Sequence, residues 1–229
     1  SMRNAETIRN QICYPELNVK IACSHGGLTP GNDGASHQAV EDMGVLRSIP
    51  NMTVVMPADY YSTKTLVKAA SEYEGPVYLR FTRDAVPIIY NEEIDLEIGK
   101  ANELVSGDDV VIIANGDTVI IALEAANELI NYHIKARVLD MHTIKPLDVD
   151  AVRKAIDEVG KIITIEDHNI INGLGSAVAE QVAERGKGIL RRIGIQDAFG
   201  ESAPYARLLE KNGITKENVV KLARELFEI

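Results

Sequence analysis

The sequence has no tryptophan, three phenylalanines and only two cysteines among its 229 residues. Cys13 and Cys23 are too few to form a disulfide framework in a chain of this length, so we predict reduced thiols in a cytoplasmic protein. Long apolar runs are also missing: no stretch approaches the roughly 20 residues that span a bilayer, and the first residues do not form a secretory signal. We therefore expect neither membrane insertion nor secretion.

Positive charge is scarce as well. The chain has 24 Lys and Arg against 34 Asp and Glu, a formal net charge of −10. This balance argues against broad nucleic-acid binding, which needs a positive surface, and it leaves any anionic substrate dependent on a few local cations. With 45% hydrophobic and 25% charged residues, the composition is that of an ordinary soluble globular protein of one large or two small domains.

The first 90 residues alternate between short apolar runs and helical patterns. Predicted strands are residues 18–24, 52–56 and 76–81, and predicted helices are residues 2–13, 37–48 and 60–73. This alternation is typical of parallel βαβ units with helices on both faces of the sheet. The polar, acidic stretch 91–97 is then predicted to be a linker, because its charges are costly to bury.

The second half repeats the alternation with more elements. Predicted strands are residues 109–115, 135–141, 161–166 and 189–196, each followed by a helix, with Asp148 and Thr215 as helix caps. We predict an α/β protein of two three-layer α/β/α domains with mainly parallel sheets. The first domain, residues 1–92, looks incomplete at its N-terminus, whereas the second, residues 99–229, has enough elements to fold by itself.

The densest chemistry lies in a glycine-rich loop between a predicted strand and a predicted helix. His25, Asp33 and His37 fall within this short segment, at a strand end where doubly wound sheets bind ligands. Histidine and aspartate supply hydrogen-bond donors, acceptors and a proton store near neutral pH. Two other interpretations remain open at this stage. The loop can be a simple turn in which Asp33 or Ser36 caps the next helix, or, less well supported by spacing, a metal site.

Three further histidines have a structural interpretation. His133 ends a helix and His142 follows a strand, so we expect both to be polar surface residues. His168 lies in the polar run 166–169, which precedes Gly173-Leu-Gly175; this segment could hold an anion at a helix start, but we interpret it as structural or as an interface. Cys23 should lie in a buried strand and be inert.

Several segments resemble one family. The run from His25 to Asp42 and the segment 46–59 resemble the pyrimidine-binding domain of transketolase. Residues 75–83 with Pro87 look like that family's next motif, and the segment from Thr164 to Gly175 resembles its C-terminal domain. The resemblance covers essentially the whole chain in the correct order. Asn32, where many transketolases carry an acidic residue, is a mild departure.

The resemblance implies a reaction in which a two-carbon ketol unit moves between sugar phosphates of the pentose phosphate pathway, with thiamine diphosphate and Mg as cofactors. It implies catalytic roles for His25, Asp33 and His37, with His37 also contacting the cofactor. Arg83, His25 and Asp33 would bind substrate, and Arg83 would clamp a phosphate with the paired donors of its guanidinium. Arg80 should point to the opposite face and be structural or at an interface.

The resemblance also implies missing parts. The family's diphosphate-and-magnesium domain, with its Gly-Asp-Gly motif, is not found in this sequence, nor is the front of the pyrimidine-binding domain with its glutamate and stacking aromatic. We expect part of a C-terminal transketolase subunit that is inactive without an N-terminal, diphosphate-binding subunit. The expected assembly is a homodimer or heterotetramer that binds sugar phosphates, with no metal site of its own and no nucleic-acid or membrane partner.

Other functions stay open at this point. Deoxyxylulose-phosphate synthase and a 2-oxoacid dehydrogenase beta subunit are related enzymes, although Glu41-Asp42 and Pro50-Asn51-Met52 look more like transketolase. A different class is a noncatalytic assembly or regulatory-ligand module built on residues 99–229.

Overall fold

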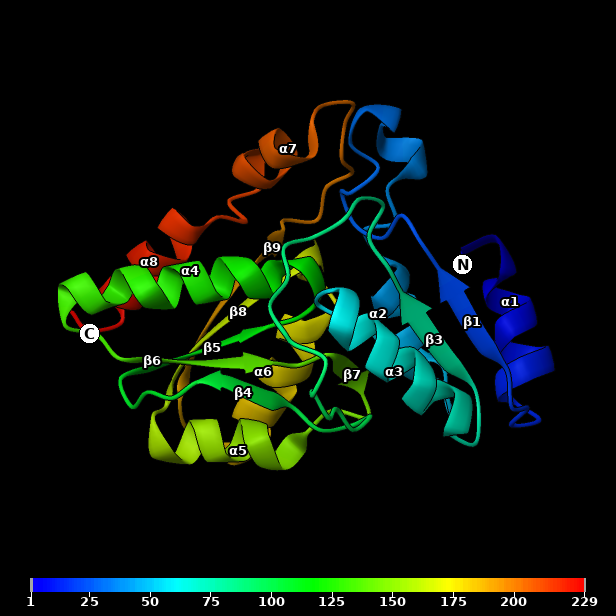
Figure 1. Cartoon of the computed structure of the whole chain (residues 1–229), viewed down its shortest axis with the longest axis horizontal. Helices are drawn as coiled ribbons and strands as arrows, with labels where there is room; N and C mark the ends of the chain where they lie inside the picture. Colours follow the sequence, from blue (N-terminus) through cyan, green and yellow to red (C-terminus); the bar gives the residue numbers. More distant parts are fainter. Residues whose placement is uncertain (1, 229) are drawn as a thin grey trace.

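The computed structural model describes residues 2–228, which form two mainly parallel sheets with helices around them (Figure 1). The first sheet has the order β1-β3-β2-β7, with β1 (Lys20–Cys23), β2 (Thr53–Val55), β3 (Val77–Arg80) and β7 (Thr143–Lys145). The second has the order β4-β6-β5-β8-β9, with β4 (Asn102–Val105), β5 (Val110–Ala114), β6 (Ala136–Asp140), β8 (Lys161–Asn169) and β9 (Ile189–Ile195). The predicted α/β fold class is confirmed.

The helices follow the predicted alternation. Their bounds are α1 (Ala5–Thr7), α2 (Asp42–Ser48), α3 (Tyr60–Glu72), α4 (Val119–Leu129), α5 (Val149–Glu158), α6 (Leu174–Arg185), α7 (Tyr205–Lys211) and α8 (Lys216–Glu225). The predicted helix over residues 2–13 is a continuous helical segment made of a 3₁₀ turn, α1 and the π-helix η2 (Ile8–Cys13). The predicted caps are confirmed, because Asp148 accepts from Ala151 N–H and Thr215 accepts from Asn218 N–H.

Alternating side chains place helices on both faces of each sheet. In the second sheet, Ile112 and Ile163 face α4 and α8, whereas Val111 and Ile162 face α5 and α6. In the first sheet, Val54 packs toward η2 and α2, and its neighbour Val55 packs toward α3. This two-residue period is what a strand buried on both faces requires, and it gives the two three-layer units seen in Figure 1.

Strand β7 joins the first sheet although its flanking segments belong to the second. It pairs antiparallel with β2, with Val54 opposite Lys145 and Val55 opposite Thr143. The Lys145 ammonium then donates to the carbonyls of Arg47 and Ile49, at 3.0 and 2.5 Å, at the end of α2. The two sheets are therefore interlocked by a strand that sequence periodicity did not predict.

Two predicted local features are wrong. Strand β1 is not buried: Ala22 is exposed and Cys23 half-buried, because β1 has a neighbour on one side only within residues 2–228. Helix α2 starts at Asp42, not near His37. The intervening residues are held in the loop instead, with Gln38 extended and Gly27 N–H donating to Ala39 O at 2.8 Å. No helix within residues 2–228 is long and apolar enough to cross a bilayer.

Candidate functional site

The glycine-rich loop closes on itself at the carboxyl ends of β1 and β3. Gly26 N–H donates to Phe81 O at 3.0 Å, just after β3, and Gly27 N–H donates to Ala39 O at 2.8 Å. The base of the loop is thus fixed, with His25 immediately before it and His37 two residues before its end. The topology places both histidines at the sheet edge where parallel α/β sheets bind ligands.

Both histidines are exposed, and each has a hydroxyl on one ring nitrogen. His25 Nδ1 lies 2.8 Å from Ser24 Oγ, and His37 Nδ1 lies 3.1 Å from Ser36 Oγ. With Nδ1 engaged, Nε2 of each ring is available to a ligand. His25 also adopts φ +66°, a left-handed conformation that is uncommon for a residue with a side chain and is found preferentially at functional sites.

Asp33 and Arg83 form an ion pair at the rim of the loop. Arg83 Nη1 lies 2.7 Å from Asp33 Oδ2, with the two side chains 38% and 41% exposed, and it also donates to Pro30 O at 2.8 Å. The remaining guanidinium donors can accept an anionic ligand. The alternative in which Asp33 or Ser36 caps the next helix is wrong, because α2 follows Glu41 and has no side-chain cap.

Residues of the second sheet and of the segment after β9 support this loop through hydrogen bonds. Leu28 N–H donates to the Asp167 carboxylate, at 3.1 Å to Oδ1 and 2.9 Å to Oδ2. Gln38 Nε2 donates to Glu201 O at 3.0 Å, and Ser202 Oγ donates to Asn32 O. Figure 1 shows the loop, in blue, beside the orange segment between β9 and α7. The sequence predicted a structural or interface role for the polar run 166–169 but did not single out Asp167 or its contact with Leu28.

Arg80 lies between the two sheets and is completely buried. Its Nε donates to Asp42 Oδ2 at 3.0 Å, and its Nη2 donates to Ala39 O and to Asp167 O, both at 3.0 Å. Tyr78 Oη donates to the same Asp42 oxygen at 2.6 Å. Arg80 is therefore a structural residue at an interface, as predicted, and it occupies the carboxyl-end crevice of the second sheet.

The start of α6 agrees with the structural interpretation, because the chain's own Glu166 occupies the position where an anion could bind. Its carboxylate accepts from Leu174 N–H at 2.7 Å and from Gly175 N–H at 2.8 Å, while burial raises the pKa of Glu166 to about 7. His168 is also structural: Nδ1 lies 2.6 Å from Asn169 O, and Gly44 N–H donates to Nε2 at 3.2 Å. Burial lowers the pKa of His168 to about 4, so the ring is neutral and links β8 to α2.

Two of the remaining predictions about single residues are wrong. His142 is not on the surface: it is 1% exposed, and burial lowers its pKa to about 4. It is buried because it lies between β6 and β7, where the chain passes from one sheet to the other. His133 is exposed, as predicted, and ends a 3₁₀ turn with φ +58°. Cys23, predicted to be buried, is half-buried because β1 lies at the sheet edge.

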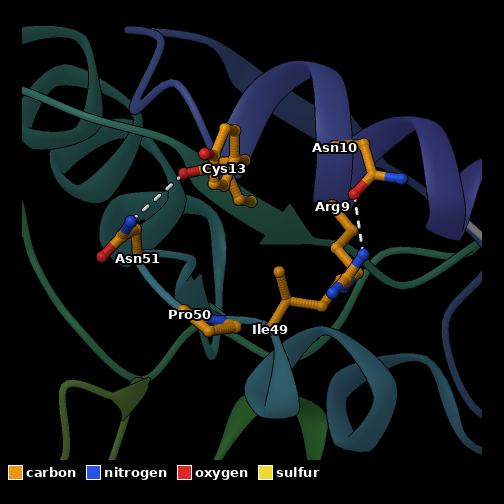
Figure 2. Close-up of a pocket in the computed structure, with 7 residues that line it drawn as sticks. Arg9, Asn10, Cys13, Ile49, Pro50 and Asn51 are labelled. Atoms are coloured by element: carbon orange, nitrogen blue, oxygen red, sulfur yellow. Dashed lines mark hydrogen bonds between the residues drawn. The ribbon is translucent and has the colours of Figure 1, made fainter.

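Two of the hollows in the first domain bear on the candidate site. One, of about 390 Å³, is next to Arg83 and is lined by Phe81, Val86 and Ile88 together with polar side chains such as Asp59 and Asp84. The other, of about 110 Å³, lies between η2 and residues 49–51 (Figure 2) and contains no predicted site residue. Within residues 2–228, no three His, Cys, Asp or Glu side chains are grouped closely enough to hold a metal ion.

The fold and this site define an α/β protein of two sheets, in which the glycine-rich loop of the first unit is hydrogen-bonded to the second. The family model of the transketolase pyrimidine-binding domain matches residues 1–88, and that of the transketolase C-terminal domain matches residues 99–219. The chain belongs to the transketolase family.

Relatives of known description agree with this assignment. A protein of Methanocaldococcus jannaschii described as a transketolase C-terminal section is 47% identical over 98% of this chain and 71% of that protein. A subunit of the apulose-4-phosphate transketolase of Phocaeicola vulgatus is 42% identical over 99% of this chain and 72% of that protein. A split-gene transketolase, solved as an inactive beta4 tetramer, matches with a TM-score of 0.91 at 45% identity, covering 97% of this chain and 71% of that one. The relatives also include 1-deoxy-D-xylulose-5-phosphate synthases.

Proposed function

We propose that the chain is the C-terminal section of a thiamine-diphosphate-dependent transketolase that transfers a two-carbon ketol unit between sugar phosphates, in the cytoplasm and within the pentose phosphate pathway. The observation that carries this proposal is the gathering of His25, Asp33, His37 and Arg83 around one closed loop at a sheet edge. Relatives described as a C-terminal section and as one subunit of a transketolase support a second, diphosphate-binding subunit as partner in a dimer or heterotetramer.

Each side chain has a role that fits its surroundings. Arg83 binds the substrate phosphate through guanidinium donors that Asp33 leaves free, because a half-exposed pair exchanges partners at little cost. Asp33 accepts a hydrogen bond from a substrate hydroxyl and so selects the stereoisomer. His25 and His37 move or hold protons at substrate oxygens near the reacting carbon and stabilise the charge that develops there.

The donor set fits the substrate side of the cofactor and not its diphosphate. Exposed imidazoles, a carboxylate and a guanidinium can contact sugar hydroxyls, a phosphate and, through His37, the cofactor itself. Thiamine diphosphate, when bound, supplies the carbon that carries the two-carbon unit. We assign its diphosphate and Mg to the partner subunit.

The proposal is tested by measuring ketol transfer from xylulose 5-phosphate with thiamine diphosphate and Mg, for this chain alone and with a diphosphate-binding subunit. We expect turnover only in the mixture. His37→Ala should lower kcat by about 10²–10³-fold. Arg83→Lys should raise KM for the phosphorylated donor by about tenfold while changing kcat less, because lysine lacks the paired planar donors.

His133→Ala is the matched control, since His133 is an exposed histidine on the second domain and should leave both constants unchanged. Robust turnover by the chain alone would contradict the need for a partner. Formation of 1-deoxy-D-xylulose 5-phosphate and CO2 when pyruvate and glyceraldehyde 3-phosphate are supplied, with no ketol transfer from xylulose 5-phosphate, would assign the chain to the related synthase. A complex that assembles but shows no His37-dependent activity would favour a noncatalytic module.

A further inference from the structure

Three polar side chains from three separate elements meet beneath the glycine-rich loop. Asp117 follows β5, Asp167 lies in β8, and Tyr205 is the first residue of α7. The Tyr205 hydroxyl donates to Asp117 Oδ2 and lies 3.2 Å from Asp167 Oδ2. Both carboxyl groups are in the interior, with Asp117 7% and Asp167 1% exposed. Two acids therefore share one phenol away from water.

A proton count shows what this arrangement requires. A phenol carries one proton and donates best to one of the two carboxylates, so the second contact becomes a full hydrogen bond when the acid itself carries a proton. Burial raises the pKa of Tyr205, which keeps that hydroxyl protonated. The balance of charge also favours a protonated acid, because one buried guanidinium, Arg80, faces the three carboxyl groups of Asp42, Asp117 and Asp167. Full ionisation would leave an excess of buried negative charge, which is costly.

The titratable and charged groups around Asp167 come from several elements. They are Asp42 on α2, Tyr78 and Arg80 on β3, Asp117 after β5, Tyr205 on α7, and Glu166 and His168 on β8 itself. Among them Arg80 alone is a fixed cation, and it already pairs with Asp42 at 3.0 Å. Burial, followed by the charge of Asp117, raises the pKa of Asp167 to about 8, and burial also raises that of Asp117.

Asp167 is at the same time the group on which the loop rests. Leu28 N–H donates to both of its oxygens, and a methyl group at Gly27, where φ is +63°, would collide with its carboxyl group. The loop between Gly26 and Ala39, which carries Asp33 and His37, therefore has one of its backbone supports at this acid.

We propose that Asp167 is a positioning residue for the site loop, and that it seats the loop as a neutral acid in a pair with Asp117 that retains one proton. The catalytic role of the loop rests on the proposed function, whereas the support of the loop by Asp167 does not. When the pair loses its proton to solvent, two buried anions share one hydroxyl, and the loop lifts to let water in. The loop is held most firmly near the ordinary aspartate pKa of about 4, its hold weakens as the pH rises from there toward about 8, and it changes no further above that value, where the buried pair is ionised in the closed state as well.

Hydrogen exchange of the Leu28 amide in the full chain tests this directly, at a series of pH values from about 6 to about 9.5 and after correction for intrinsic exchange. In the wild type, protection should fall as the pH rises toward about 8 and level off above it. Asp167→Asn should retain protection throughout this range, because the amide oxygen accepts from Leu28 and the amide nitrogen donates to Tyr205. Asp167→Ala should exchange about tenfold faster at every pH.

Glu166→Gln is the matched control: it neutralises an adjacent buried acid that holds α6 and not the loop, so the pH response of Leu28 should remain that of the wild type. The proposal is overturned if Asp167→Asn shows the wild-type alkaline loss, if Asp167→Ala stays protected, or if Glu166→Gln abolishes the response. In the ketol-transfer assay, Asp167→Asn should likewise flatten the alkaline limb of kcat/KM. Absence of ketol transfer with the expected exchange pattern would refute the proposed function and leave the seating intact.

Discussion

Arg80 and Arg83 are three positions apart, yet they differ in burial, which determines how much each ion pair contributes to the stability of the fold. The Arg80 side chain is 0% exposed and pairs with an Asp42 side chain that is also 0% exposed, whereas Arg83 and Asp33 are 38% and 41% exposed. A buried pair that loses one partner leaves an uncompensated charge in the interior, and a half-exposed pair is compensated by water. We therefore expect Arg80 to determine stability and Arg83 to determine ligand binding.

Arg80→Ala should lower the free energy of unfolding by about 3–5 kcal/mol, because the buried Asp42 carboxylate loses its cation and the carbonyls of Ala39 and Asp167 each lose one donor. Arg83→Ala should cost about 0.5 kcal/mol or less. Urea denaturation at neutral pH measures both. Equal losses in the two variants would show that exposure is not what separates these arginines.

At the scale of the residue, the sequence allowed candidate site residues to be proposed but not the contacts that support them. His25, Asp33 and His37 could be proposed because one short glycine-rich segment contains them, and Arg83 because it lies in a second motif of the family resemblance. Asp167 lies 139 positions from Leu28, and its role depends on how two sheets dock, which local patterns do not encode. His142 was misplaced for the same reason, since its burial comes from a crossing between sheets.

Helix α3 shows how one capping residue can join an element to a distant segment. Asp59 accepts from Ser62 N–H at the start of α3, in a capping box, and also from the N–H groups of Ile89 and Tyr90, all at 2.8 Å. Burial raises the pKa of Asp59, but these hydrogen bonds outweigh burial, and the pKa lies below its usual value. The ionised Asp59 carboxylate thus holds both the start of α3 and residues 89–90, which lead into the predicted linker.

Asp59→Ala should cost about 1–3 kcal/mol near neutral pH, more than a simple cap, because three backbone donors lose their acceptor. Because the folded pKa is lowered, this stability is present above the unfolded pKa of about 4 and is lost as the pH falls below it. Unfolding in urea at about pH 7 and about pH 3 measures the change. Thr215→Ala, a cap with one acceptor bond, is the control and should cost about 1 kcal/mol with no such pH dependence. A loss independent of pH in Asp59→Ala would contradict the assignment.

Elements with strong periodicity were predictable, and short polar ones were not. The apolar, β-branched runs that became β5, β6, β8 and β9 were all predicted. β4 (Asn102–Val105) and β7 (Thr143–Lys145) are four and three residues long, and neither differs in composition from a loop. The start of α2 was misplaced because residues 35–39 bond to the glycine-rich loop, a competition that helix propensity does not register.

On the scale of the whole molecule, the chain has an open sheet edge. Val77 N–H donates to Val19 O and Phe81 N–H donates to Cys23 O, so alternation turns the peptide groups of Ala22 away from β3. Ala22 is exposed, and β1 ends the sheet within residues 2–228. An unpaired edge of this kind is a template for association with another strand.

The chain by itself should therefore associate in a concentration-dependent manner. Ala22→Pro should weaken that association without unfolding the protein, since proline removes only the outward N–H and is tolerated on an edge strand. Size-exclusion chromatography with light scattering measures the mass, and thermal unfolding verifies that the variant is folded. A monomeric wild-type chain, or an Ala22→Pro variant that associates equally well, would refute the role of β1.

Length and patterning predicted two α/β units at this scale but could not show how they are joined. The acidic stretch 91–97 suggested a simple linker, whereas β7 returns to the first sheet some 50 residues later. A strand that crosses between sheets leaves no trace in hydrophobic periodicity, because Thr143, Ile144 and Lys145 suit either sheet equally well.

The position of β7 also determines what would happen if the chain were cut. A protease that severed residues 91–97 would separate the covalent halves but not the folded ones, because β2 would still pair with β7 across the break. Arg80 would still donate to the backbone of Asp167, and Asp167 would still accept from Leu28. The products would behave as a complementing fragment pair that co-purifies until denatured, because the second half supplies the strand β7 that completes the sheet of the first.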